Sequence, residues 1–210
     1  MERDASAFDA RDAYHLLTAV VAPRPIAWVT TQGPDGVVNA APFSWYNAVC
    51  ADPMMVMLAI HDRKDGSPKD TVRNARATGE LVVNAVAAAD VEAAVATSAD
   101  YPPEVSEPAT LGLPLSPSVR VRPPRLASSP VHLECRLERE LTLGRRQDLR
   151  LLFCEVLHVG LDDAVLDARG RVDAKRLVLA ARLGGAWYAD TRAPFEVRRP
   201  EAPSPPERQT

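Results

Sequence analysis

Residues 23–53 read PRPIAWVTTQGPDGVVNAAPFSWYNAVCADP, and the first part of this stretch carries the clearest β-structure signals of the chain. The β-branched and aromatic residues at 26–31 are typical of a strand, and the GPDG sequence at 33–36 is a strong turn signal. A second apolar run follows at 37–41. The stretch therefore predicts a β-hairpin, and the prolines on either side of Arg24 favour an extended approach to it.

The segments on either side extend this pattern into a mainly β chain. The expected strands span 54–60, 81–86, 131–143 and 149–161, with shorter β-type runs near Val165 and at 176–181. The expected helices span 10–21 and 91–99. The run at 54–60 is apolar throughout, which suggests a strand buried on both faces. Many strands with few helices, and no regular βαβ alternation, predict an antiparallel barrel with helices at its rim.

The length and the proline content indicate one domain and a tail. The chain has 210 residues, 46% of them hydrophobic, which is enough for one sizeable core. We expect a domain over residues 1–192 and a disordered, Pro-rich tail over 193–210. Prolines are also frequent at 102–130, but they alternate there with apolar residues, so we expect an ordered covering loop.

The charge balance excludes two classes of partner. The chain has 25 Lys and Arg against 28 Asp and Glu, a net charge of -3, so no basic excess is available for nucleic acid or for an anionic membrane. No apolar run is long enough for a membrane helix, and the acidic, polar start lacks the features of a signal peptide. A cytoplasmic location is therefore expected.

Three widely spaced cysteines, Cys50, Cys135 and Cys154, fit reduced and mostly buried thiols better than a disulfide framework. Cys50 follows an aromatic segment and could approach a redox cofactor. It has no second cysteine nearby in sequence and no neighbouring base, so a buried, small apolar residue is the better interpretation.

A helix start is predicted at Ser67, which is followed by a proline and then by an acid at the third helical position. This arrangement is a capping box, and the helix should end at Gly79. The free amides of such an end, with Lys69 and the hydroxyl of Thr71, would suit a phosphate. A plain cap beside a solvated lysine explains the same residues, and the segment taken alone favours that simpler interpretation.

Residues 39–49, NAAPFSWYNAV, concentrate aromatic and amide side chains in a chain that is only 5% aromatic. Aromatic faces beside hydrogen-bonding groups suit a flat heterocycle with polar edges, such as a flavin. The same residues could fill the end of a barrel and satisfy a turn, and composition alone favours that alternative.

Four blocks of sequence together resemble the flavin reductase-like family of FMN-binding split barrels. They are residues 23–53, KDTVRNARATGELVVNAV at 69–86, PPRLASSPVHLECRLE at 123–138 and AARLGGAWYAD at 180–190. The resemblance covers about residues 12–190. It implies a mainly β fold, a six-stranded antiparallel Greek-key split β-barrel with peripheral helices. It also implies a homodimer that holds FMN near the subunit interface.

The resemblance also implies which residues hold the flavin. Those that correspond to the lining of its ring and ribityl chain are Thr30, Thr31, Ser44, Trp45, Tyr46 and Asn47. Lys69 and Thr71 correspond to the phosphate end, which agrees with the helix start described above. Arg24, His61 and Tyr188 are further candidates, but a lone histidine and a tyrosine after a turn are readily explained as structural residues.

The implied chemistry is hydride transfer from NADH or NADPH to flavin N5, followed by delivery of reduced flavin or electrons to a partner such as a monooxygenase component. FMN is the expected flavin and FAD the alternative. No side chain is assigned a catalytic role, because the sequence has no GxSxG elbow and no metal-ligand pattern. It also has no GxGxxG motif, so the donor would have to bind without a Rossmann domain.

Two other functions remain open from the sequence. The first is a non-catalytic FMN-binding electron carrier, similar to flavoredoxin, or a flavin-storage protein. The second keeps the barrel for a different ligand, because split barrels also bind pyridoxine phosphate and haem. The preferred nucleotide, the electron acceptor, and the question of whether flavin is a prosthetic group or a substrate are not decided.

Overall fold

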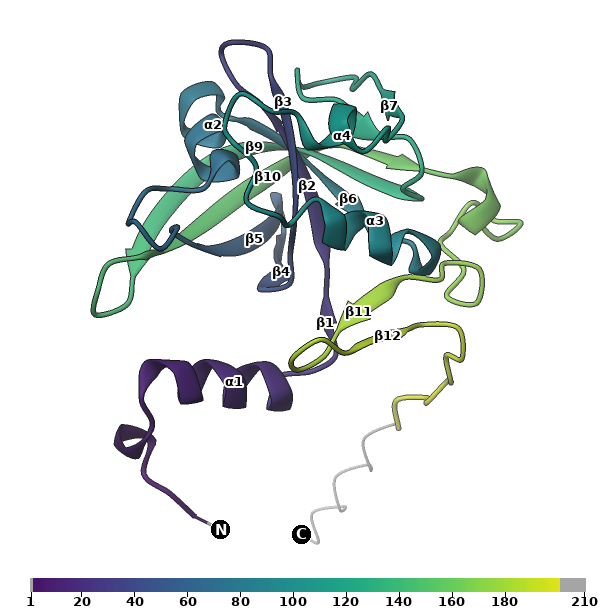
Figure 1. The fold of residues 1–210 in the computed structure, drawn as a ribbon. Coiled ribbons are helices and arrows are strands. Elements are labelled where there is room, and N and C mark those ends of the chain that lie inside the picture. The colour runs from purple at the N-terminus through teal and green to yellow at the C-terminus, as the bar shows by residue number, and fades with distance from the viewer. Residues whose placement is uncertain (1, 201–210) are drawn as a thin grey trace, which may run out of the picture.

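The computed structural model describes residues 2–200 and is mainly β, as the sequence predicts (Figure 1). Its main sheet has seven strands, each antiparallel to its neighbours, in the order β3-β2-β6-β9-β10-β5-β4. They are β2 (Ala27–Gln32), β3 (Val38–Phe43), β4 (Tyr46–Ala51), β5 (Met54–His61), β6 (Glu80–Ala85), β9 (Val131–Leu143) and β10 (Leu149–Leu161). The hairpin predicted from residues 26–41 is the β2–β3 pair.

The strand order shows that this sheet curves back on itself. β3 and β4 are its two edges, yet only Ser44 and Trp45 separate these strands in the chain. The three peptide units between Phe43 and Tyr46 span at most about 11 Å. The two edges must therefore approach each other at Ser44 and Trp45, and the sheet forms an open barrel.

Strand β2 is buried on both faces because it separates two hydrophobic clusters. Ala27 and Val29 belong to the larger cluster, with side chains of β5, β6, β9 and β10. Trp28, together with Ile26 just before the strand, belongs to a second cluster, which includes Ala94 of α3 (Val91–Ala96). The alternation of side chains along a strand accounts for this division.

The helices lie around the barrel. Besides α3, they are α1 (Ala10–Val20), α2 (Asp70–Thr78) and α4 (Glu107–Thr110), with 3-10 turns η1 (Ala5–Ala7), η2 (Ala88–Asp90) and η3 (Asp163–Val165). A small sheet contains β1 (Arg24–Pro25), β11 (Ala180–Arg182) and β12 (Tyr188–Asp190). Figure 1 shows α1 below the barrel, on the same side as β11 and β12.

Residues 102–130 form an ordered covering segment, as predicted. The segment contains α4 and a short ladder of β7 (Leu115–Ser116) with β8 (Arg125–Leu126). Near its middle, the carboxylate of Glu134 on β9 accepts hydrogen bonds from the amides of Val119 (2.9 Å) and Arg120 (2.6 Å). A fully buried carboxylate therefore attaches the segment to the barrel.

Several sequence predictions need correction. The sheet has seven strands rather than six, because residues of the expected aromatic bend continue into the edge strand β4. Strand β5 is not buried on both faces: alternate side chains are partly exposed, because only one face packs in the barrel. The run near Val165 forms the 3-10 turn η3, and of the run 176–181 only the end enters β11.

The predicted tail is only partly described. Residues 193–200 contain neither helix nor strand and are exposed, whereas residues 201–210 lie outside the described residues. The domain boundary at residue 192 and the Greek-key connection remain predictions.

Candidate functional site

Helix α2 begins later than the sequence predicts. Lys69 occupies the N-cap position without a side-chain cap hydrogen bond, and the first helical residue is Asp70. The prediction that Ser67 is the N-cap is wrong, because its hydroxyl donates to Asp65 Oδ1 at 2.6 Å. The predicted end is confirmed, because Gly79 caps the helix with φ +73°, in the left-handed region.

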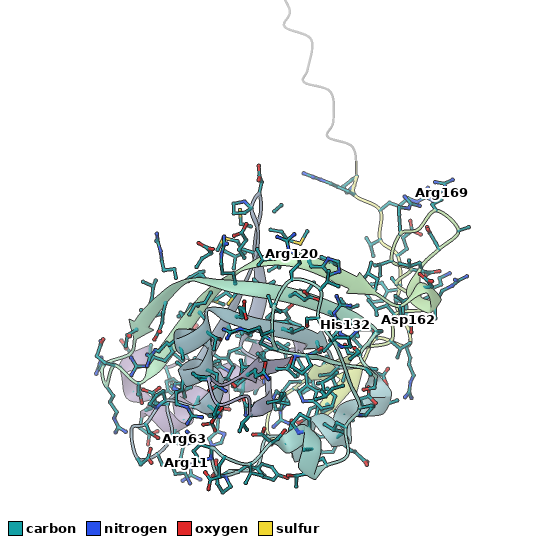
Figure 2. All side chains as sticks on the ribbon, turned by 90° about the horizontal axis from the view of Figure 1, so that it is seen from above. Arg11, Arg63, Arg120, His132, Asp162 and Arg169 are labelled. Atoms are coloured by element: carbon teal, nitrogen blue, oxygen red, sulfur yellow. The ribbon has the colours of Figure 1, made fainter. Side chains whose placement is uncertain are left out.

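A small pocket of about 50 Å³ lies at this helix end, and we call it the Lys69 pocket. The ammonium of Lys69 lies 5.7 Å from the centroid of the Phe43 ring. No described carboxylate forms an ion pair with Lys69, whereas Asp70 is paired with Arg63 and with Arg73 (2.7 Å). Lys69 is thus the cation of this pocket that remains available to an anion. Figure 2 labels Arg63, which also lines the pocket, at the lower left of its view.

A buried hydrogen-bond network forms the wall of the Lys69 pocket. Thr71 Oγ1 donates to Asn39 Oδ1 (3.0 Å), and Thr31 Oγ1 donates to the same oxygen (3.3 Å). Asn39 Nδ2 in turn donates to Glu107 Oε1 at 2.7 Å. The single hydroxyl proton of Thr71 is therefore already donated to Asn39. The group of Thr71 that remains available to a ligand is its backbone N–H in the first turn of α2.

The network also includes a perturbed carboxyl group. Glu107 is almost fully buried, and its second carboxylate oxygen accepts the amide of Ala40 at 3.0 Å. Burial raises the pKa of Glu107 above its ordinary value, with a smaller contribution from the nearby carboxylate of Asp70.

Thr30 and Thr31 lie inside the fold. Both are fully buried, and Thr30 Oγ1 donates to the carbonyl of Pro124 at 2.6 Å. Neither residue lines the Lys69 pocket or the two cavities described below. The structure therefore does not bring these two predicted residues to the surface beside the others.

A larger cavity of about 350 Å³, which we call the Arg24 cavity, adjoins the Lys69 pocket and shares Pro42 and Ser98 with it. It lies between α1, α3 and the β11–β12 hairpin, and Tyr188 is part of its lining. Arg24 Nη1 donates to the carbonyls of Thr18 (2.6 Å) and Val21 (2.7 Å) at the end of α1.

The same guanidinium connects three parts of the chain. Arg24 Nη2 donates to the carbonyl of Leu183 (3.0 Å), and Nε donates to Ser44 Oγ (3.4 Å). Burial, and then repulsion by Arg182, lower the pKa of Arg24 from its ordinary value, with an opposing effect of Tyr14. Arg24 thereby fixes the relative positions of α1, the Ser44 connection and the β11–β12 hairpin.

A third cavity, also about 350 Å³, lies along Ser44, Trp45, Tyr46 and Asn47, and we call it the Trp45 cavity. It shares Arg24 and Ser44 with the Arg24 cavity. The three spaces therefore lie next to one another, and the two ends of the site predicted from the sequence border the same central cavity.

The side chains around Trp45 are arranged as an aromatic group. Its ring is stacked with Tyr14 (centroids 6.2 Å apart) and meets the exposed His61 edge-on (6.2 Å). The indole Nε1 is buried without a hydrogen-bond partner among the described residues. Tyr46 packs against the barrel core, and burial raises its pKa to about 12. Asn47 is exposed, and its side-chain oxygen accepts the amide of Ala48.

The structure corrects the prediction for one cysteine. Cys50 is exposed, because it lies on the edge strand β4, where the pairing with β5 has an irregularity between Ala48 and Cys50. Cys135 and Cys154 are buried as expected.

Three residues that line the site were not predicted from the sequence. They are Asn39, Glu107 and Arg182. Asn39 belonged to the amide-rich segment but was not singled out. Its partner Glu107 lies 68 residues away, and the contact between Arg24 and Leu183 spans 159 residues. No local pattern can reveal partners at such separations.

Two kinds of feature are absent from residues 2–200. These residues contain no group of three or more His, Cys, Asp or Glu side chains that could hold a metal ion. Within the same range, no helix combines the length and the apolar character needed to cross a membrane.

The sequence and structure match known proteins over most of their length. An uncharacterized protein of Halalkalibacterium halodurans is 37% identical over 203 residues, covering 95% of this chain and 97% of the relative. The crystal structure of nitrilotriacetate monooxygenase component B from Bacillus cereus is 32% identical with a TM-score of 0.88, covering 94% of this chain and 98% of that one. The 2-nitrobenzoate 2-nitroreductase NbaA of Pseudomonas fluorescens is 29% identical with a TM-score of 0.88, covering 97% and 99%.

The family model described as "Flavin reductase like domain" matches residues 21–178. This range includes the barrel from β2 to β10, the Lys69 pocket and the Ser44–Asn47 wall. The chain therefore belongs to the flavin reductase-like family.

Proposed function

We propose that the protein is an FMN-dependent NAD(P)H:flavin reductase. The observation that carries this proposal is the ammonium of Lys69 above the Phe43 ring, because Phe43 directly precedes Ser44 and Trp45. A free cation suited to a phosphate and an aromatic wall suited to a flavin ring are thereby adjacent. The Arg24 cavity borders both, because it shares Pro42 and Ser98 with the Lys69 pocket and Arg24 and Ser44 with the Trp45 cavity.

The residues at both ends fit FMN chemically. At one end, Lys69 has no described carboxylate partner, and the first-turn amides of α2 have no intrahelical acceptors. At the other end, the buried Nε1 of Trp45 is a donor without a described acceptor, and flavin supplies carbonyl and hydroxyl oxygens. Arg24 and Tyr188, in the cavity between them, extend the proposed site.

Each part of this site has a separate task. Bound flavin supplies the ring that accepts a hydride from the nicotinamide of NADH or NADPH. Lys69 neutralises the phosphate, while the Ser44–Asn47 wall orients the ring and excludes water from one face. No side chain is required to act as an acid or a base. The small volume of the Lys69 pocket, about 50 Å³, favours a terminal phosphate and hence FMN over FAD.

The similar proteins support a reductive role that serves a second reaction. One is a component of nitrilotriacetate monooxygenase, and another is a nitroreductase. We therefore propose that reduced flavin, or its electrons, pass to a partner such as a monooxygenase component. The alternative is an electron carrier that does not react efficiently with pyridine nucleotide.

A homodimer is part of the proposal. Helix α1 exposes Leu17 (45%) and Val20 (65%), and its C-cap residue Val21 is also exposed (56%), which is unusual for a helix of a folded monomer. Leu17 and Val21 also line the Trp45 cavity. A second copy of the chain covering this helix would close the Trp45 cavity. Sedimentation equilibrium of the purified protein tests the proposed homodimer, and a monomer at micromolar concentration would contradict it.

The central test uses two flavins and two lysine variants. Lys69→Ala should weaken FMN binding about 10- to 100-fold, the loss of one charge-assisted contact of about 1.5–3 kcal/mol. Riboflavin lacks the phosphate, so its affinity should not change. The matched control is Lys64→Ala, in the same exposed loop. Equal losses for both flavins would show that the phosphate lies elsewhere.

A second experiment separates the reductase from the carrier. The FMN-loaded protein is mixed with NADH and with NADPH in the absence of oxygen, and the flavin absorption is followed. Rapid bleaching supports the reductase. A constant trace with both donors favours the carrier, and a protein that binds no flavin would overturn the whole proposal.

A further inference from the structure

Two arginines face each other in the wall of the Arg24 cavity. Arg24 on β1 and Arg182 on β11 are direct cross-strand partners, and both line this cavity. Like charges directly opposite each other destabilise a sheet. None of the described residues that line the cavity is an aspartate or glutamate, and neither arginine forms an ion pair with a described carboxylate. The cavity therefore presents two positive charges without a carboxylate to balance them.

Arg182 retains free hydrogen-bond donors, whereas Arg24 does not. Arg24 directs four of its five N–H groups at neighbouring oxygens, as described above. Arg182 donates to the Tyr188 hydroxyl and the Gly185 carbonyl, and its other three N–H groups have no partner among the described residues. Its guanidinium carbon lies 4.4 Å from the centroid of the Tyr188 ring, and the residue is half-buried. Arg182 is therefore held in position at the cavity wall with donors available to a ligand.

The Arg24 cavity is the middle one of the three spaces of the proposed flavin site. It borders the Lys69 pocket, assigned to the phosphate, and the Trp45 cavity, assigned to the ring. FMN held at both ends would pass through this cavity, so the ribityl chain and the adjoining edge of the ring would lie there. The ribityl chain is attached at N10, and the acceptors on that edge of the ring are N1 and O2. These two atoms would therefore come next to the arginine pair.

Reduction of the flavin places a negative charge on the same two atoms. A hydride from NADH or NADPH adds two electrons and one proton at N5, the donor is oxidised to NAD+ or NADP+, and the resulting charge is shared by N1 and O2 of the flavin. A fixed cation at this position stabilises the charged product more than the neutral oxidised ring. A guanidinium is suited to this task, because its planar fork can donate to two neighbouring acceptors at once.

We propose that Arg182 donates to N1 and O2 of the bound flavin and thereby stabilises its reduced, anionic form. This inference rests on the proposed function and adds to it a residue that raises the reduction potential of the flavin. Arg182 forms no covalent bond and transfers no proton, because the charge that it balances arrives with the hydride. Arg24 contributes a second positive charge from the opposite strand.

One other residue could supply a positive charge to the same cavity. The remaining titratable residues of its lining are Tyr14 and His15 of α1 and Tyr188 of β12, whereas α3 contributes none. Histidine is the one residue type among these that gains a positive charge near neutral pH. The test therefore has to separate Arg182 from His15.

The first test measures the reduction potential of bound FMN by anaerobic titration against a reference dye. Arg182→Gln should weaken binding of reduced flavin about 10- to 100-fold more than binding of oxidised flavin, the loss of one charge-assisted contact. The potential should then fall by about 30–60 mV, since a tenfold change corresponds to about 30 mV for a two-electron couple. Arg182→Lys keeps the charge but not the planar fork, so its potential should lie between the two. Arg192→Gln, an exposed arginine beyond β12, is the matched control and should leave the potential unchanged.

The second test counts protons, from the slope of the potential against pH. The anionic reduced form takes up one proton for two electrons, and the neutral reduced form takes up two. In the parent protein, the one-proton slope should persist to a lower pH than for free FMN measured alongside, because a neighbouring cation favours the anion. Arg182→Gln should return the change of slope toward that of free FMN, whereas His15→Gln should not. The measurement on the parent requires no variant, so it decides even if Arg182→Gln folds poorly.

Several outcomes would overturn the inference. They are an unchanged potential in Arg182→Gln, equal weakening of oxidised and reduced flavin, bound flavin with the slope of free FMN, and a fall in potential caused by His15→Gln instead. If Lys69→Ala still selectively weakens FMN, the proposed function would survive each of these results. If Arg182→Gln weakens FMN more than riboflavin while Lys69→Ala does not, the phosphate lies in the Arg24 cavity, and both assignments fail.

Discussion

Replacing Glu134 by glutamine should destabilise the protein strongly. The carboxylate is fully buried and accepts hydrogen bonds from the amides of Val119 (2.9 Å) and Arg120 (2.6 Å) and from Arg125 Nε (2.8 Å). A glutamine has one acceptor oxygen. In either orientation, its NH2 group therefore faces donors, and Arg125 loses its counter-charge. Breaking a buried pair in this way costs about 3–5 kcal/mol.

The free energy of unfolding in urea, followed by tryptophan fluorescence, measures this cost. For a domain of this size, a loss of about 3–5 kcal/mol corresponds to a decrease of roughly 6–20 °C in Tm. The control is Glu138→Gln, whose ion pair with Arg136 is exposed and should matter little. If the two variants lose similar stability, Glu134 does not anchor the covering segment as described.

Two other predictions concern titrating groups. Burial is the main cause that raises the pKa of Glu107 in the folded protein. The Glu107 carboxyl group therefore stabilises the fold fully at a pH below its pKa in the unfolded chain, near 4.5. This stabilisation is lost as the pH rises through the higher pKa of the folded protein. The free energy of unfolding in urea, measured for the parent relative to Glu107→Gln, should therefore decline from pH 4 to pH 8. If the difference between the two proteins stays constant over this range, burial does not raise the pKa of Glu107 as described. A thiol reagent at neutral pH should modify Cys50 rapidly but Cys135 and Cys154 only on unfolding, because burial raises the pKa of Cys154 to about 12 and that of Cys135 well above its ordinary value. Mass spectrometry counts the modified thiols, and fast modification of three would show that the barrel opens readily.

The sequence predicts the regular part of the fold well, because periodicity and turn residues act locally. The bounds expected for the two long strands, 131–143 and 149–161, coincide with β9 and β10. The end of α2 was also predicted, since a glycine at a helix end has a direct backbone cause. Strand β4 was missed because its role at the edge depends on pairing with β5, which residue types alone do not reveal.

The site is less predictable, because its groups are defined by partners distant in the chain. Ser67 has the composition of an N-cap, but Asp65 takes its hydroxyl and the helix begins after Lys69. Thr71 was expected to offer its hydroxyl to a phosphate, whereas that hydroxyl donates to Asn39. The resemblance selected residues that the structure places around adjoining cavities, and the tertiary contacts decide which of their atoms are free.

The connection from β3 to β4 has a consequence for dynamics. Ser44 and Trp45 join the two strands at opposite ends of the sheet order, and they also line the proposed ring site. A bound molecule would therefore hold the two edge strands of the open barrel together. The free energy needed for local opening of β3 and that for local opening of β4 would both rise by the same binding free energy. Amide hydrogens of β3 and β4 should then slow their exchange in parallel when ligand is added, although five other strands separate them in the ladder.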